Sequence, residues 1–471
     1  GKEVCKLMSF RNDSWAILTA DNFYAAARGA LPSLAFRFRD RAFTFEQFDL
    51  RFHRPDKVLE CFKFAQTELA AAYREAFQQR LKRMNYTEAM LGNDFDVPEV
   101  ELAAFPPPST RERTIKLRVK ARDGRFNLDR VHIDVNGVPL RGANGIDVRK
   151  PAARTWEQEV EVELSAGDNR IDVSVLNEKG AESLRQTATV RCEAAAKKPD
   201  LYVVAVGVSD YADARFKLVY ADKDARDLSE LLAGKRAGFG EVKVLRVLNR
   251  DATRENILNA AEFLKPAGVD DAVVVFFAGH GVLDAKRDYF FGTADIDFAD
   301  PAKRGLPYAG IEGLLDGARA RKKLLLVDTC HSGEVNKEDT ALPAGAAQPD
   351  GAVRAVARGG LTPEAPPRVG LKNSFQLMQD LYADLRRGTG AVVVASAGGA
   401  EYALESAEWK NGVFTYAVLR GLKGGADRNK DGKVQVLELR GYVEEEVRRL
   451  TGGRQSPTAR SDNVLFDFAI D

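Results

Sequence analysis

Two short stretches of the sequence place a base and a nucleophile at equivalent positions. Residues 271 to 291 read DAVVVFFAGHGVLDAKRDYFF, so His280 lies between two glycines at the end of an apolar run. Residues 322 to 334 read KKLLLVDTCHSGE, which puts Cys330 at the end of a similar run. A cysteine nucleophile needs a base to generate its thiolate, and imidazole is suited to that near neutral pH. The pair therefore predicts covalent cysteine catalysis.

Other interpretations of these two residues are structural or metal-binding. A lone cysteine at a strand end is usually an inert core thiol, and a lone histidine usually makes ordinary hydrogen bonds. His331 follows Cys330, but the sequence offers no third soft ligand for a metal. Because both residues occupy equivalent strand tips beside small residues, the catalytic pair is favoured. The backbone N–H groups of Gly281 and Cys330 are the candidates for an oxyanion hole, since glycine leaves its N–H unobstructed.

The elements that must position these residues alternate between apolar strands and amphipathic helices. The first expected strand, LYVVAVGVS, is a continuous apolar run, as in a sheet covered on both faces. Further strands are expected at EVKVLRVL, AVVVFFAG, KLLLVDTC and AVVVASAG. Helical patterns such as DKDARDLSELLAGK and TRENILNAAEFLK separate them. This alternation predicts a mainly parallel α/β sheet flanked by helices, with ligands at the carboxyl ends of the strands.

The part of the chain before residue 199 has a different organisation. Residues 1–60 are β-rich, and DSWAILTADNFYAAARG resembles a piece of a bacterial WD-type propeller blade. One blade cannot close a propeller, so a β-rich adaptor packed on its neighbour is the alternative. Residues 61–110 read as a helix followed by the Pro-rich linker FPPPST. In residues 111–195 apolar residues alternate with charged ones, which predicts an immunoglobulin-like β-sandwich.

Composition excludes several classes of partner. Lys plus Arg is 70 and Asp plus Glu is 69, so nucleic acid and an anionic membrane are not expected partners. No apolar run approaches the roughly 18 residues of a membrane span. The four cysteines are widely spaced with no CxxC pair, which favours a reducing, cytoplasmic location over a disulfide framework or zinc site. The chain begins at Gly1 rather than Met, so an upstream segment is compatible with the sequence.

The motifs FFAGHG and, 50 residues later, VDTCHSG resemble the caspase, metacaspase and orthocaspase family of cysteine peptidases. The resemblance covers residues 199–471 and suggests a bacterial multidomain member. It implies a caspase-hemoglobinase fold, with Cys330 as nucleophile and His280 as general base and acid. The implied reaction is peptide-bond hydrolysis through a thioester acyl-enzyme, with no cofactor required. GVFTYAVLRGL resembles the C-terminal subunit region of the family.

The residues that resemble the family's specificity pocket are acidic. Asp328 precedes the nucleophile by two residues, as in metacaspases, and KLVYADKDARDL places Asp224 where metacaspases have a pocket aspartate. Leu218 stands where animal caspases have a pocket arginine. Two carboxylates favour a guanidinium, so arginine is expected before the cleaved bond, with lysine second. Asp224 is alternatively a helix N-terminal charge, and Asp222 is a substitute for it in the pocket.

Residues 427–438, DRNKDGKVQVLE, fit the twelve-residue EF-hand calcium loop. The expected ligand positions are held by Asp427, Asn429, Asp431, Lys433 and Glu438. A rigid turn rich in Asp and Asn, without metal, is the alternative. No second loop accompanies this one, which argues for a structural or weak calcium site.

Residues 334–369 read as an internal linker rich in Ala, Gly and Pro. It begins directly after the nucleophile and carries Arg354 and Arg358, so self-cleavage is expected, with Arg358-Gly359 the better candidate bond. A passive surface loop is the alternative. For the whole chain we expect an endopeptidase acting on protein or peptide substrates. The competing hypothesis is a catalytically silent scaffold whose N-terminal β domains recruit a protein partner.

Overall fold

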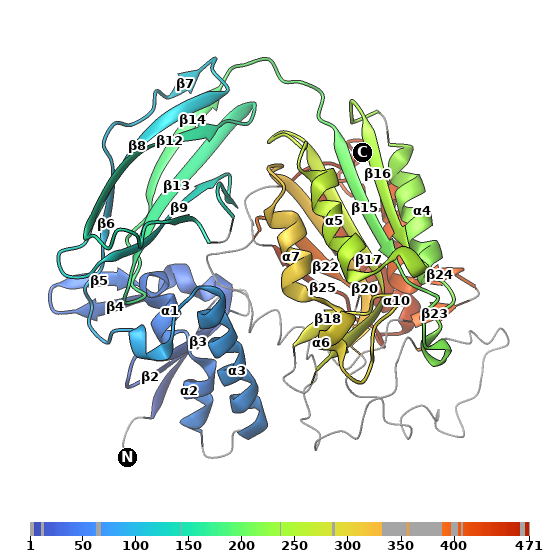
Figure 1. Ribbon diagram of the computed structural model, residues 1–471, viewed down its shortest axis with the longest axis horizontal. Coiled ribbons are helices and arrows are strands. Elements are labelled where there is room, and N and C mark those ends of the chain that lie inside the picture. Colours follow the sequence, from blue (N-terminus) through green and yellow to red (C-terminus); the bar gives the residue numbers. More distant parts are fainter. Residues whose placement is uncertain are drawn as a thin grey trace. The chain divides into compact units, whose positions relative to one another are not determined.

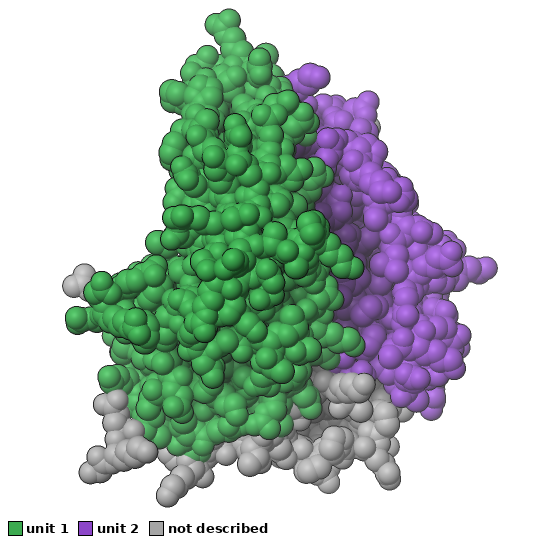
Figure 2. Space-filling view, turned by 60° about the vertical axis from the view of Figure 1, so that its left-hand side comes forward, with its two compact units in different colours: residues 1–196, 378–389 green, residues 197–377, 390–471 purple. Residues whose placement is uncertain are grey.

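The chain divides into two compact units, one of residues 1–196 with 378–389 and one of residues 197–377 with 390–471 (Figure 2). A computed structural model describes residues 4–10, 14–62, 67–142, 144–235, 237–284, 288–331, 356–357, 389–396, 404–406, 408–461 and 467–470. The units are described separately below. No described helix is both long enough and apolar enough to cross a bilayer.

The second unit is built on one twisted sheet with strand order β16-β15-β17-β20-β22-β25. Its strands are β15 (Leu201–Gly207), β16 (Val242–Leu248), β17 (Ala272–Leu283), β20 (Lys322–His331), β22 (Val392–Ala395) and β25 (Thr458–Ser461). The first five are mutually parallel and β25 runs antiparallel to β22, so the predicted parallel α/β sheet is confirmed. Every residue of β15 is buried, as expected for a strand covered on both faces.

Helices cover both faces of this sheet. Those that the structure describes are α4 (Ala221–Ala233), α5 (Arg254–Leu264), α7 (Tyr308–Asp316), α9 (Val413–Arg420) and α10 (Val436–Thr451), and the short helix α6 (Pro301–Arg304) precedes β19. Helix α5 packs beside α7, and α4 packs on α9, which in turn contacts α10; Figure 1 shows α5 and α7 along one side of the sheet and α4 along the other. Short strands β18 (Tyr289–Phe291) and β19 (Leu306–Pro307) extend the sheet beyond the carboxyl end of β17.

Strand β15 is the point at which the chain changes the side on which it adds the next strand of the sheet. The chain passes from β15 to β16 on one side and then returns to β17 on the other. In open α/β sheets the loops diverge at such a switch point and leave a crevice at the carboxyl ends of the strands. The loops after β15 and β17 therefore start at the same edge of the sheet, where His280 lies.

The first unit contains a β-sandwich. One sheet has the order β12-β8-β6 and the other β10-β9-β13-β14-β7, with β11 paired to β9. The strands are β6 (Glu99–Leu102), β7 (Ser109–Thr110), β8 (Thr114–Arg122), β9 (Leu128–Val135), β10 (Val138–Pro139), β11 (Ile146–Asp147), β12 (Thr155–Glu163), β13 (Gly167–Asn177) and β14 (Gln186–Cys192). Strand β8 alternates buried and exposed residues throughout, as predicted from its period of two. Asn136 and Gly137 both have positive φ in the tight β9–β10 hairpin.

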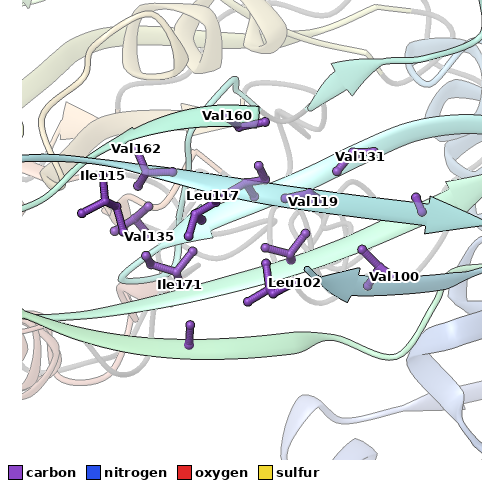
Figure 3. Packing of buried hydrophobic residues seen from close by; sticks show 14 of the residues in the cluster. Val100, Leu102, Ile115, Leu117, Val119, Val131, Val135, Val160, Val162 and Ile171 are labelled. Atoms are coloured by element: carbon purple, nitrogen blue, oxygen red, sulfur yellow. The ribbon is translucent and has the colours of Figure 1, made fainter. Parts of the chain in front are cut away.

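The apolar side chains of both sheets meet in a common core (Figure 3). Its members include Leu117, Val119, Val162 and Ile171, each essentially without solvent exposure. The sandwich begins upstream of residue 111, where the sequence analysis placed its start, because β6 (Glu99–Leu102) pairs with β8.

The N-terminal part of this unit combines a small sheet, β1 (Cys5–Ser9), β2 (Trp15–Thr19) and β3 (Tyr24–Ala26), with the hairpin β4 (Ala35–Phe38) and β5 (Arg41–Thr44). Helices α1 (Asp49–Phe52), α2 (Pro55–Glu60) and α3 (Thr67–Arg83) follow. Buried aromatic residues make up most of its core, which also contains Leu31 and, from the sandwich, Ala181. The Tyr86 hydroxyl donates to the Asn177 carbonyl at 2.8 Å, so this part packs on the sandwich.

Candidate active site

Strands β17 and β20 bring the backbones of the two predicted catalytic residues together. Their parallel register pairs Ala278 with Asp328, His280 with Cys330, and continues to the next residue of each strand. Neighbouring strands lie about 4.8 Å apart, so residues paired in register start from adjacent positions. The structure thus places His280 and Cys330 side by side at the carboxyl edge of the sheet, although they are far apart in the sequence.

The imidazole of His280 is buried, with 1% of its surface exposed. Its Nε2 lies 2.8 Å from the backbone carbonyl oxygen of Phe216. A carbonyl oxygen only accepts hydrogen bonds, so Nε2 carries the proton in the neutral ring and Nδ1 is the basic nitrogen. The Phe216 carbonyl therefore selects the tautomer in which Nδ1 can take up a proton.

Aromatic side chains enclose the imidazole. The ring centroids of Tyr211, Phe298 and Phe216 lie 5.0, 5.6 and 6.0 Å from that of His280. Phe216 and Phe298 stack on each other at 3.6 Å. Such packing holds the ring in one rotamer, because any rotation would displace closely packed neighbours.

The loop that supplies Tyr211 and Phe216 connects β15 to α4 and is closed on itself. The Leu218 N–H donates to the Ser209 carbonyl at 2.9 Å. The Lys217 ammonium lies 2.9 Å from Asp210, and this hydrogen bond raises the pKa of Lys217 above its usual value. Both side chains are largely exposed to solvent, so this ion pair adds little to the stability of the loop.

The two predicted pocket aspartates both contact the start of helix α9, and both are fully buried. Asp328 accepts a hydrogen bond from the Thr415 hydroxyl at 2.6 Å. Asp224 accepts from the Asn411 amide at 2.9 Å and from the Gly412 N–H at 3.2 Å. Negative charge is favoured at a helix N-terminus. Asp224 from α4 and Asp328 from β20 therefore converge on one helical turn.

Asp222, the alternative to Asp224, has different partners. Its carboxylate accepts hydrogen bonds from the Ser209 hydroxyl at 2.7 Å and from the Asn249 amide at 3.2 Å. These partners belong to the loops after β15 and β16. Asp222 thus secures a loop, whereas Asp224 faces α9.

A third carboxylate near this position was not predicted from the sequence. Glu405, in strand β23 (Leu404–Ser406), is 2% exposed and accepts from the Val219 N–H at 3.4 Å. Strand β23 pairs with β24 (Asn411–Gly412), which also carries the partners of Asp224. Residues 403–406 read ALES, two apolar residues followed by two polar ones, so no period-two pattern marked Glu405 in the sequence.

The remaining predicted residues of the site are only partly within the described chain. Gly281 lies in β17, paired with Phe291 of β18 and with His331 of β20. Arg354 and Arg358 lie outside the described residues. Between them, β21 (Val356–Ala357) is described and pairs antiparallel with β23.

The predicted calcium loop, residues 427–438, follows a π-helical turn (Gly421–Gly425) and runs into the first turn of α10, which begins at Val436. The Asp427 and Asn429 side-chain oxygens both accept from the Asp431 N–H, at 3.2 and 2.9 Å. Glu438 accepts from the Asn429 N–H at 3.3 Å and from the Gln435 N–H at 3.1 Å. These are the hard oxygen ligands that calcium prefers, although no described group of three His, Cys, Asp or Glu residues is arranged around a metal position.

The residue at position eight of this loop is paired with another segment of the chain. Val434 is buried, and its carbonyl accepts from the Ile470 N–H at 3.1 Å, while the Val436 N–H donates to Phe468 at 3.0 Å. A segment near the C-terminus therefore supports the loop from one side.

Comparison with known proteins identifies the second unit. A family model described as the caspase domain matches residues 201–469. No curated protein matches the chain. Among solved structures, protein GSU0716 from Geobacter sulfurreducens is 18% identical, with 56% of this chain and 93% of that chain covered and a TM-score of 0.38. Caspase-1 from Spodoptera frugiperda is 15% identical, covering 56% and 87%, with a TM-score of 0.32.

A further similarity is to fibronectin(III)-like modules of Clostridium thermocellum CbhA. The identity is 22%, with 21% of this chain and 48% of that chain covered and a TM-score of 0.17.

Proposed function

Because the chain belongs to the caspase-domain family of cysteine peptidases, we propose that it hydrolyses peptide bonds that follow a basic residue, arginine in preference to lysine. The observation that carries the proposal is the β17–β20 register, which sets His280 beside Cys330. A panel of fluorogenic peptides that differ only in the residue before the cleaved bond tests it. If none of the peptides is cleaved, the competing hypothesis of a catalytically silent scaffold is favoured.

In the proposed reaction Nδ1 of His280 accepts the thiol proton of Cys330, and the thiolate attacks the carbonyl carbon of the substrate. The C–N bond then breaks as His280 returns the proton to the leaving amine, which leaves a thioester. Water, deprotonated by the same imidazole, attacks the thioester and releases the acid and the thiol. The Phe216 carbonyl supports this cycle, because it holds Nε2 protonated and gives Nδ1 the basic role throughout.

The N–H groups of Gly281 and Cys330 are proposed to bind the oxygen that becomes negatively charged in the tetrahedral intermediate. Both groups come from strands whose register is set by the sheet. Donors on rigid strands need little reorganisation during the reaction, which is what makes such stabilisation effective.

The proposed preference for arginine rests on charge and geometry. Asp328 lies two residues before Cys330 on the same strand, and Asp224 contacts the same helical turn as Asp328. A planar guanidinium offers a fork of donors to two carboxylates, whereas an ammonium group acts as a point charge. An aspartate side chain at this position would meet like charge and be rejected.

Self-cleavage after Arg358 is a second part of the proposal. Supporting it, Val356 pairs with Glu405 and Ala357 with Leu404 in an antiparallel ladder. An extended chain added to a strand is a common way for proteins to bind peptides. The bond after Arg358 is therefore the expected site, one residue beyond this paired segment.

Purified protein is expected to convert with time into two fragments separated by a cut between residues 358 and 359. Intact-mass spectrometry would identify the bond. Arg358→Ala should block this cut, while Arg354→Ala, the matched control on the other side of β21, should leave it in place. Equal clipping of wild type and of Cys330→Ala would show that a contaminating peptidase is responsible.

We also propose that the loop of residues 427–438 binds calcium through the side chains of Asp427, Asn429, Asp431 and Glu438 and the backbone carbonyl of Lys433. Calcium bound there would hold the beginning of α10 and the segment paired with Val434 together. Its contribution would be to stability, because no step of the proposed reaction passes through it.

Calcium is expected to raise the unfolding temperature. At a hundredfold excess over Kd, mass action adds about 2.7 kcal/mol to the free energy of unfolding. Calorimetric scans with calcium and with a chelator would measure this shift. Asp427→Ala combined with Glu438→Ala should remove the response, whereas Asp467→Asn, a neighbouring acid outside the loop pattern, should retain it. A wild-type scan that is unchanged at millimolar calcium would leave only the rigid-turn interpretation.

A further inference from the structure

One polar contact to His280 comes from the side chain of Tyr211. The backbone N–H of His280 donates to the Tyr211 hydroxyl at 2.9 Å, and the two rings lie 5.0 Å apart. Tyr211 is 7% exposed and lies in the loop between β15 and α4. A single residue therefore contacts both the backbone and the imidazole of His280.

The Tyr211 hydroxyl stands where the neighbouring strand would otherwise continue. The ladder between β15 and β17 ends at the pair of Gly207 and Ala278, and Val208 then donates to the Ala278 carbonyl at 3.0 Å. In a strand the N–H and C=O groups of alternate residues face the same side, so the N–H of His280 also faces the β15 side. Because β15 has ended, the tyrosine hydroxyl serves as the acceptor there.

The carbonyl of His280 is secured in a similar way. The Gly292 N–H donates to it at 2.8 Å. A Cβ atom at Gly292 would lie 3.1 Å from that carbonyl oxygen and 3.4 Å from the Tyr211 ring. The N–H and the C=O of His280 thus both have hydrogen-bond partners, Tyr211 and Gly292, in the place that β15 would occupy if it continued.

Glycine at position 279 makes the approach of Tyr211 possible. A Cβ atom built there would lie 2.8 Å from the Tyr211 hydroxyl oxygen and 3.2 Å from the ring of Phe291. The first distance is too short for a carbon and an oxygen that are not bonded, and both rings are packed into the core. The glycine before His280 therefore has a packing role, separate from any role of the glycine that follows.

From these contacts we infer that Tyr211 is a positioning residue for the catalytic base, because its hydroxyl and ring set the orientation of His280 beside Cys330. The inference rests on the proposed function, since it assigns Tyr211 to the same dyad. It makes Tyr211 necessary for the rate of the chemical step and not for substrate binding. A misplacement of the base by a fraction of an ångström is enough to slow such a step.

The test compares Tyr211→Phe with wild type in peptide turnover and in the rate at which iodoacetamide alkylates Cys330, followed by peptide mass spectrometry. We expect kcat and the alkylation rate each to fall by about 10- to 100-fold, because a buried donor loses its acceptor, while KM stays within about twofold. The unfolding temperature should change by only about 2–4 °C.

Tyr202→Phe is the matched control. Tyr202 is also buried, on β15 of the same sheet, and its hydroxyl lies 3.0 Å from the Lys243 ammonium. This variant loses a comparable polar contact that does not involve His280, so its kcat should stay within about twofold of wild type. An equal loss of kcat in both tyrosine variants would overturn the inference.

Gly279→Ala provides a second, independent variant. It should lower kcat at least as much as Tyr211→Phe, and its effect should be smaller when measured in the Tyr211→Phe background, because the hydroxyl that meets the new methyl group is then absent. Wild-type kcat and alkylation rate in Tyr211→Phe would refute the positioning role. If wild-type Cys330 itself reacts no faster than in His280→Ala, the proposed dyad fails instead.

Discussion

Replacing Cys330 by alanine is expected to lower kcat/KM for arginine peptides by about 10⁴-fold or more, because no other group on the strand edge can form the thioester. His280→Ala should cause a comparable loss, since the thiol then lacks a base. Residues that act as one catalytic unit are not additive, so the double variant should be hardly worse than either single variant. Progress curves at high enzyme concentration would measure these rates.

The two variants should differ in stability. His280 is enclosed by Tyr211, Phe216 and Phe298, so its truncation leaves a cavity among buried rings. The unfolding temperature of His280→Ala should therefore be lowered, and activity must be compared under conditions where it remains folded. Retention of wild-type peptidase activity by Cys330→Ala would show that the nucleophile is another residue.

Asp328→Asn is expected to produce the second large effect, a loss of preference for arginine. Asparagine keeps an oxygen that can accept from the Thr415 hydroxyl but removes the charge that a guanidinium would meet. Loss of one partner from a buried charge pair typically costs about 2–5 kcal/mol, so kcat/KM for arginine peptides should fall by about 30-fold or more. Peptides with an uncharged residue at the same position should be much less affected.

Asp222→Asn is the control for this prediction. Asp222 lies on the same helical segment as Asp224, but its carboxylate bonds Ser209 and Asn249 instead of α9. It should keep the ratio of arginine to uncharged peptide turnover, whatever it does to stability. A preference for arginine that survives Asp328→Asn unchanged would place the specificity pocket elsewhere.

The parallel sheet was predictable because its central strands β15, β17, β20 and β22 contain continuous apolar runs, whereas the edge strand β16 carries Lys243 and Arg246 and is mostly half-buried. Such runs mark strands buried on both faces, and their carboxyl ends must share one edge. The positions of His280 and Cys330 followed from that rule, and the observed register brings their backbones side by side. The sandwich was predictable for a different reason, because apolar residues recur with a period of two along its sequence, and in β8 and β14 burial follows the same period.

The partners of the site residues were not predictable, because they depend on loops. The acceptor for His280 Nε2 is a backbone carbonyl, that of Phe216, and a carbonyl has no signature in the sequence. The position of Tyr211 just after β15, at the same edge as His280, could have suggested that it lies near the site. Its hydrogen bond with the His280 N–H could not have been predicted. The contacts of Asp224 and Asp328 with α9 join segments nearly 190 and 90 positions apart.

The most direct measurement is covalent labelling with two peptidyl chloromethyl ketones that are identical except for a terminal arginine or aspartate. We expect one adduct per chain with the arginine reagent, located on Cys330 by peptide mass spectrometry, with labelling abolished in His280→Ala and strongly slowed in Asp328→Asn. The aspartate reagent should leave the protein unmodified over the same period. An adduct on a different residue would rule out Cys330 as the nucleophile, and equal labelling of Cys330 by the two reagents would rule out the acidic specificity pocket.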